Sequence, residues 1–201
     1  MSGDLPAGQR LQIRQVAEQL GSSVMPVREA IKRLEEIGLV ESQPYRGAVV
    51  RSFTTDEVLN LYEVRRLLEV EAATLGAARA TDEDVVRLRE IRQQMEQSLN
   101  AQRDVDYLNK DEEFLTVIYA ASGNPFLLES IDRLWRRCRS YKIFGARQEM
   151  KAGQPSELLR HQDDLIAAVE ARDSAQAAQI TKASLDDATA RIRLALPEDS
   201  E

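Results

Sequence analysis

The fold of the first part of this 201-residue chain can be predicted from residues 12–50, which read QIRQVAEQLGSSVMPVREAIKRLEEIGLVESQPYRGAVV. Its apolar residues recur at spacings of three or four in two segments, the first broken by Gly21 and the second ended by Gly38. The two apolar stripes are Ile13, Val16, Ala17 and Leu20, and then Val27, Ala30, Ile31, Leu34 and Ile37. This pattern predicts two short helices joined by a tight turn that contains glycine.

The second of these helices has polar residues that suit the major groove of DNA. Ser23 can cap its first amide groups, and Pro26 falls in its first turn, where the missing N–H costs nothing. Arg28 and Lys32 are four apart and share the face opposite the apolar stripe. Such charges are often only a solvated helix face, but their place after a helix and a turn favours contact with DNA.

A pair of strands is predicted next, over residues 39–42 and 48–50. Between them, Pro44-Tyr45-Arg46-Gly47 supplies a glycine for an unusual backbone angle and an arginine that can reach a phosphate. Two helices followed by a basic-tipped hairpin predict a small winged helix-turn-helix domain over residues 1–52.

The same residues resemble the GntR family of bacterial transcription regulators. The resemblance rests on Leu20-Gly21, Ser23, Pro26-Val27-Arg28-Glu29-Ala30, Arg33-Leu34, Gly38-Leu39-Val40 and Gly47-Ala48-Val49-Val50. The rest of the chain is similar to the FadR-type C-terminal ligand-binding domain of that family, so the two resemblances cover nearly the whole chain. With the motif above, they imply DNA contacts from Arg14, Ser23, Met25, Pro26, Arg28, Lys32, Arg46 and Gly47.

The chain departs from the family pattern in two places. The family places an arginine directly after the serine at the head of the recognition helix, where this chain has Val24. Because a good base contact contributes about 1–3 kcal/mol of discrimination, we expect the DNA sequence that is read to be altered or relaxed. The family also places a helix before the turn Gly3-x-Leu5-Pro6-x-Gly8, where this sequence begins. We therefore expect either a first helix missing from the sequence or an unusually small, less stable domain.

The charge of the chain is unevenly distributed. Residues 1–52 contain seven Lys or Arg and six Asp or Glu, a net charge of +1. The remainder contains 20 and 28, a net charge of −8, so the C-terminal part accounts for the overall charge of −7. The single Cys138 excludes an internal disulfide framework and fits a reducing compartment. There is no signal peptide and no apolar run long enough to span a bilayer, so we expect a cytoplasmic protein that does not act at a membrane.

After residue 53 the pattern predicts only helices. They cover residues 55–79, 82–101, 104–121, 125–148, 156–171 and 174–195. Their borders are marked by Thr81 with Asp84, Ser122-Gly123-Asn124-Pro125 and Gly153-Gln154-Pro155-Ser156. The predicted fold class is therefore mainly α: a small winged helix-turn-helix domain, followed over residues 55–201 by an all-helical antiparallel bundle that binds an effector and dimerises.

Four of these helices each carry one polar residue on an otherwise apolar stripe. These residues are Arg65, Asp111, His161 and Ser184. Because a buried polar or charged group without a partner is costly, we expect them to pair with one another or with a ligand. Trp135 and Cys138 also lie at helical spacing, and we expect them in the core.

The resemblance implies that this bundle often holds a divalent metal through one Asp and three His. The Asp matches Asp111 and one His matches His161, but the other two positions are Leu115 and Ser184. Two donors are too few for a tight transition-metal site, so we predict no metal and no other cofactor.

Relatives of this type are expected to respond to small carboxylates, sugar acids or acyl thioesters. Arg65 matches a family residue that lines the cavity, and a guanidinium is well shaped for a bidentate carboxylate contact. Two other interpretations stay open at this stage. Arg65 and Glu69, four apart, can form an ordinary helix salt bridge, and His161 can be a satisfied interior histidine.

Together these features predict a ligand-responsive transcription regulator, in the commoner case a repressor released by its ligand. We expect a homodimer on a near-palindromic operator in double-stranded DNA and a small-molecule effector of the carboxylate type. An alternative is a ligand-binding or interaction protein whose DNA reader has decayed, which Val24 favours. An enzyme is not expected, because the chain has one His, one Cys, no nucleophile elbow and no phosphate-binding glycine loop.

Overall fold

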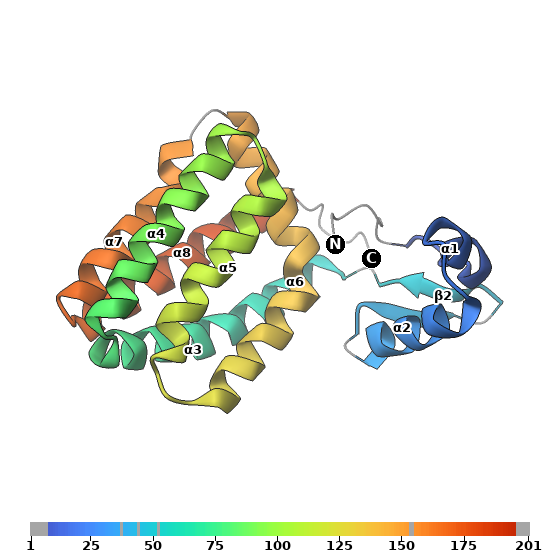
Figure 1. Ribbon diagram of the computed structural model, residues 1–201, viewed down its shortest axis with the longest axis horizontal. Helices are drawn as coiled ribbons and strands as arrows, with labels where there is room; N and C mark the ends of the chain where they lie inside the picture. Colours follow the sequence, from blue (N-terminus) through green and yellow to red (C-terminus); the bar gives the residue numbers. More distant parts are fainter. Residues whose placement is uncertain (1–7, 37, 44, 52, 153–154, 196–201) are drawn as a thin grey trace. The chain divides into compact units, whose positions relative to one another are not determined.

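The computed structural model describes residues 8–36, 38–43, 45–51, 53–152 and 155–195 (Figure 1). It divides into two compact units, which we call the N-terminal unit (Met1–Thr54) and the bundle (Thr55–Glu201). The turn at Gly3, Leu5 and Pro6, the stripe residue Ile37 and the turn residue Pro44 lie outside the described residues. The fold class is mainly α, as predicted.

The N-terminal unit contains the two predicted helices and the predicted hairpin. Helices α1 (Ile13–Gln19) and α2 (Val24–Glu36) are followed by strands β1 (Val40–Gln43) and β2 (Gly47–Val50). The strands pair antiparallel, with Val40 opposite Val50. Strand β1 is shifted by one residue from the predicted 39–42, and β2 begins one residue before the predicted 48–50 and ends at the same residue. The small core of this unit consists of Leu11, Ala17, Val27, Ile31, Val40 and Ala48.

The hairpin has two features that bear on the surface it presents. Gly47 adopts φ +71°, the left-handed conformation that glycine tolerates best, which confirms the predicted use of this residue. The segment before α1 also pairs with β2, since Leu11 N donates to Ala48 O at 2.8 Å and Val50 N donates to Gln9 O at 2.9 Å. This third strand-like segment was not predicted, because it is too short to show a period of two.

The bundle consists of six helices whose borders follow the predicted punctuation. They are α3 (Thr55–Arg79), α4 (Asp82–Asn100), α5 (Asp104–Ala120), α6 (Pro125–Ala152), α7 (Pro155–Glu170) and α8 (Ser174–Ala195). Thr81 and Asp84 form a reciprocal capping box at the start of α4. Helix α6 continues to Ala152 instead of ending at residue 148, because nothing in its sequence stops it before Gly153.

The helices of the bundle pack around a single core. Figure 1 shows α4 between α7 and α5, and α3 packs most extensively against α8. Gly76 allows α3 to approach α5 closely, because a Cβ atom there would lie 2.0 Å from Ile118 O. Trp135 and Cys138 are buried in this core, as predicted. None of the described helices is both long enough and apolar enough to cross a membrane.

Candidate functional site

The residues predicted to touch DNA all lie on the surface of the N-terminal unit. Helix α2 buries Val27 and Ile31 against the core and leaves Arg28 and Lys32 exposed on its other side. The remaining members of the predicted set are exposed as well: Arg14, Ser23, Met25, Pro26, Arg46 and Gly47. Their accessibility meets the first requirement for DNA contact, while the contacts themselves stay a prediction.

The tip of the hairpin carries an aromatic residue that the sequence did not single out. Tyr45 is fully exposed and adopts φ +63°, an uncommon conformation for a residue with a side chain. It lies next to Arg46, so the tip presents a phenol ring and a guanidinium side by side in the chain.

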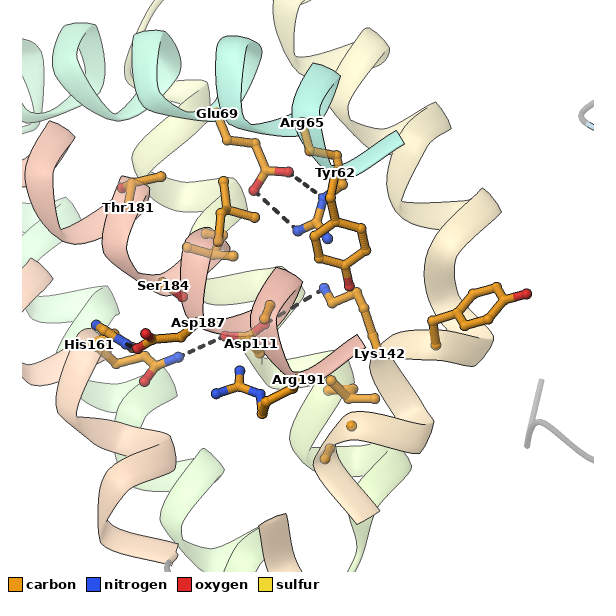
Figure 2. A pocket seen from close by; sticks show the side chains of 18 of the residues that line it. Tyr62, Arg65, Glu69, Asp111, Lys142, His161, Thr181, Ser184, Asp187 and Arg191 are labelled. Atoms are coloured by element: carbon orange, nitrogen blue, oxygen red, sulfur yellow. Dashed lines mark hydrogen bonds and ion pairs between the residues drawn. The ribbon is translucent and has the colours of Figure 1, made fainter. Parts of the chain in front are cut away.

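The bundle contains a pocket of about 340 Å³ walled by α3, α5, α6, α7 and α8 (Figure 2). Arg65, Asp111, His161 and Ser184, which come from four helices, all line it. The structure therefore brings together the four inward polar residues that the sequence identified. It gives three of them protein partners, although not one another.

At one end of the pocket, the buried carboxylate of Glu69 is the centre of a hydrogen-bond network. Arg65 Nε donates to Glu69 Oε1 at 2.7 Å, and Trp135 Nε1 donates to the same oxygen at 2.9 Å. Tyr119 donates to Glu69 Oε2 at 3.2 Å. Burial and the neighbouring Glu69 charge raise the pKa of Tyr119 well above its usual value, so the phenol stays protonated and remains a donor.

Arg65 is thus held in an ion pair with Glu69, so only part of its guanidinium could serve a ligand. Both Arg65 and Glu69 are almost fully buried, with 3% and 1% of their surface exposed. Burial opposes the charge of Arg65, but the Glu69 carboxylate more than offsets this and keeps the pKa of Arg65 above its ordinary value. Glu69 occupies the Nε–Nη2 edge of the guanidinium, and Nη1 lies 3.6 Å from Cys138 Sγ. A ligand carboxylate would have to use N–H groups on the Nη1–Nη2 edge.

In the middle of the pocket, Asp111 lies between a glutamine and a lysine. Gln162 Nε2 donates to Asp111 Oδ1 at 2.8 Å, and Lys142 Nζ lies 3.7 Å from Asp111 Oδ2. Lys142 Nζ also lies 3.3 Å from Glu112 Oε1. Burial raises the pKa of Asp111, and the nearby Lys142 charge and the Gln162 hydrogen bond oppose that rise. Lys142 thus places a cation beside Asp111 inside the bundle.

His161 and Ser184 lie on another part of the pocket wall. His161 Nε2 is 3.1 Å from Asp187 Oδ2, and because a carboxylate only accepts, this ring nitrogen carries the hydrogen. Asp187 is half exposed and also lies 3.9 Å from Arg160. His161 therefore has a protein partner and also lines the pocket.

The four positions at which the family resemblance implies metal ligands lie in the same pocket. Asp111, Leu115, His161 and Ser184 all line the pocket. Within the described ranges, no three His, Cys, Asp or Glu side chains are grouped so that they could hold a metal ion. Leu115 supplies no donor atom and Ser184 only a hydroxyl, which is a poor set for a transition metal. The expected absence of a metal stays a prediction.

Several residues that complete the pocket were not predicted from the sequence: Glu69, Lys142, Gln162 and Thr181. Glu69 was visible only as the i+4 partner of Arg65, and Gln162 only as the neighbour of His161. Lys142 and Thr181 carried no signal, because a single polar residue in a long helix is usually on its solvated face.

Both units of the chain match models of known protein families. Residues 60–187 match the FCD domain, and residues 1–50 match the bacterial regulatory proteins of the gntR family. The HTH-type transcriptional regulator McbR of Escherichia coli is 30% identical over 174 residues, which cover 85% of this chain and 77% of that protein. The HTH-type transcriptional repressor GlaR of the same organism is 26% identical over 188 residues, covering 91% of this chain and 86% of GlaR.

A solved structure, E. coli McbR/YncC, superposes with a TM-score of 0.82 at 27% identity, covering 96% of this chain and 91% of that one. These relatives carry the names of regulators and not of enzymes. The chain therefore belongs to the GntR family of bacterial regulatory proteins, and it is a DNA-binding transcription regulator whose C-terminal unit is an FCD domain.

Proposed function

We propose that this regulator is a cytoplasmic repressor whose DNA binding is released when a small carboxylate enters the pocket of the bundle. The observation that carries the proposal is the charge of the pocket wall. Four cationic residues line it, Arg65, Lys142, Arg160 and Arg191, against three carboxylates, Glu69, Asp111 and Asp187. A pocket whose lining residues include one more cation than carboxylate favours a ligand that brings a negative charge.

Lys142 is the cation best suited to meet such a ligand first. Its side chain is buried and lies near two carboxylates, at 3.3 Å and 3.7 Å. Arg65, in contrast, is held by Glu69 along one edge and offers only its other edge. A flexible ammonium can turn toward an incoming anion while it stays close to Asp111 and Glu112.

For DNA reading, we propose that α2 enters the major groove and that the hairpin tip touches the backbone. Arg28 and Lys32 lie exposed on one face of α2, and Arg46 lies exposed on the hairpin. Two copies of the chain, joined through the bundle, would place two such helices on a near-palindromic operator. The sense of control follows GlaR, which is named a repressor.

The ligand part of the proposal is tested by thermal-shift screening of small carboxylates, followed by gel shifts on the DNA that flanks the gene. We expect at least one carboxylate to raise the melting temperature and to weaken a salt-sensitive DNA complex. Lys142→Gln should weaken the binding of that compound about tenfold, the size of one charge-assisted hydrogen bond. Lys182→Gln, which removes an exposed lysine of α8, is the matched control.

Two outcomes would count against the proposal. If no carboxylate stabilised the folded protein, the effector class would be wrong. If no DNA fragment shifted even at low salt, the rival interpretation of a decayed reader would be favoured, for which Val24 at the head of α2 is the supporting observation. Sedimentation of the chain at several concentrations tests the dimer.

A further inference from the structure

The first turn of α2 exposes two apolar side chains next to each other. Val24 has 36% and Met25 63% of its surface exposed. A single exposed apolar residue is ordinary on any protein. These two, however, lie at the N-terminal end of the second helix of a helix-turn-helix, where the side chains of DNA-binding proteins contact the edges of bases. Their position therefore favours a contact with bases.

Val24 and Met25 share a side of α2 with a basic residue. Arg28 follows Val24 by four residues and Met25 by three, so the three side chains lie on one side of the helix. Val27 and Ile31 are buried, with 5% and 7% of their surface exposed, which turns this side outward. The exposed side of α2 is thus apolar in its first turn and basic one turn later.

The backbone that carries the two apolar residues is held by the turn before α2. Ser22 N donates to Ala17 O at 2.9 Å, and Leu20 N donates to Val16 O at 3.0 Å. Ala17 of α1 and Val27 of α2 both belong to the small core of the N-terminal unit. The first turn of α2 is therefore presented by packed helices, which place side chains more precisely than a loop does.

Valine and methionine can recognise only one feature of the major groove. Neither side chain has a hydrogen-bond donor, and the methionine sulfur is a weak acceptor at best. Guanine, adenine and cytosine present donors or acceptors there, which an apolar side chain would strip of water without pairing. Thymine is the one base of the four that adds an apolar group, its C5 methyl.

We infer that Val24 and Met25 read the C5 methyl groups of thymines, so that the regulator selects T·A pairs at the positions facing the first turn of α2. An arginine at the position of Val24 would instead favour guanine. Val24 then changes the base that is read and does not weaken the reader. The inference rests on the proposed function, because α2 must enter the major groove for these side chains to reach base edges.

Replacing thymine by deoxyuridine tests the inference without changing the protein, since deoxyuridine lacks only the C5 methyl. The full chain first selects its preferred sites from a pool of random DNA duplexes, and each thymine of a selected site is then replaced in turn. Gel shifts measure the affinity for every substituted duplex. We expect at least one thymine at which the replacement weakens binding about fourfold, the effect of one buried methyl-sized group.

Protein variants assign this effect to the first turn of α2. In the double variant Val24→Ser with Met25→Gln, both side chains become polar, and the thymine and deoxyuridine duplexes should bind equally well. Val24→Arg should move the preference toward guanine in a repeated selection. Val86→Ser changes a valine of α4 that is 56% exposed, so it is the matched control and should keep the fourfold effect. All these side chains are exposed, and the melting temperatures should change little.

The outcomes separate this inference from the proposed function. If no thymine replacement weakens binding, or if the double variant keeps the full effect, Val24 and Met25 do not read methyl groups. The proposed entry of α2 into the groove then stands as long as Arg28→Ala weakens binding to the selected site. If Arg28→Ala has no effect, or if no duplex is selected even at low salt, the proposed function fails and this inference fails with it.

Discussion

In the N-terminal unit, Arg14, Arg28, Lys32 and Arg46 lie in solvent, whereas in the bundle Arg65 and Lys142 lie inside beside carboxylates. No ion pair joins the four exposed residues to another side chain in the described part of the chain. Arg65, in contrast, contacts both Glu69 and Cys138. These basic residues are therefore exposed and available for DNA in the N-terminal unit, whereas Arg65 and Lys142 of the bundle are buried beside carboxylates.

This difference determines which substitutions report on function alone. An exposed arginine can be removed with little effect on the fold, since surface changes usually alter stability by less than about 0.5 kcal/mol. A buried arginine stabilises the fold through its partner, so its removal changes stability and ligand binding together.

The largest effect is expected for Arg65→Ala. It would leave Glu69 buried with two neutral donors and no counter-charge, and breaking a buried ion pair costs about 3–5 kcal/mol. Trp135, the only tryptophan of the chain, donates to Glu69, so its fluorescence during urea unfolding reports on this region. Arg133→Ala removes an exposed arginine from a salt bridge with Glu129 and should cost about 0–1 kcal/mol.

A similarly small loss of stability in Arg65→Ala and Arg133→Ala would contradict the contrast between the two units. It would mean that Glu69 becomes hydrated or protonated once Arg65 is removed. Substituting Arg65→Met together with Glu69→Leu sharpens the test. We expect this double variant to recover part of the lost stability but not all, because Tyr119 and Trp135 lose their acceptor.

The second prediction concerns the exposed side of the contrast. Arg28→Ala should weaken sequence-specific DNA binding by about 1–3 kcal/mol, the range for one arginine contact, and leave the free energy of unfolding within about 0.5 kcal/mol of wild type. Gel shifts over a range of salt concentrations give the affinity, and urea unfolding gives the stability. The same Arg133→Ala variant is the control for the loss of one positive charge.

DNA binding that is unchanged in Arg28→Ala, with Arg133→Ala also unchanged, would show that α2 does not carry the reading residues. A drop in stability would instead show that Arg28 helps to hold the small core of the N-terminal unit. Either result would remove the distinction between the two units that the exposed side chains suggest.

The contrast also explains how much could be predicted from the sequence. The exposed residues of α2 follow from spacing alone, because Val27 and Ile31 fix which face is buried and Arg28 and Lys32 must then face outward. The helix borders followed from local signals such as the Thr81–Asp84 capping box. These features depend only on residues near one another in the chain.

The pocket could be predicted only in part, because its residues are far apart in the chain. Arg65, Asp111, His161 and Ser184 stood out as polar residues on apolar stripes, and the structure places all four in one pocket. Their partners come from other helices: Lys142 is 31 residues from Asp111, and Gln162 is 51 residues from it. Which side chains meet across helices depends on packing that a single sequence does not contain.

The smallest expected effect is the pH dependence contributed by Asp111. Burial raises its pKa in the folded protein above the value in the unfolded chain, so between the two values the folded state binds more protons. Stability is therefore favoured below the ordinary pKa of about 3.9 and declines as pH rises through the raised pKa. Asp111→Asn cannot ionise and keeps an oxygen for Gln162, while Lys142 keeps Glu112. The stability of Asp111→Asn relative to wild type should increase between about pH 4 and pH 7 in urea unfolding experiments.

Asp132→Asn, which neutralises an exposed carboxylate on α6, controls for the loss of one negative charge. A decrease for Asp111→Asn over the same range would show that attraction to Lys142 outweighs burial, and Asp111 would then belong with Glu69 as a carboxylate that the bundle needs in its charged form.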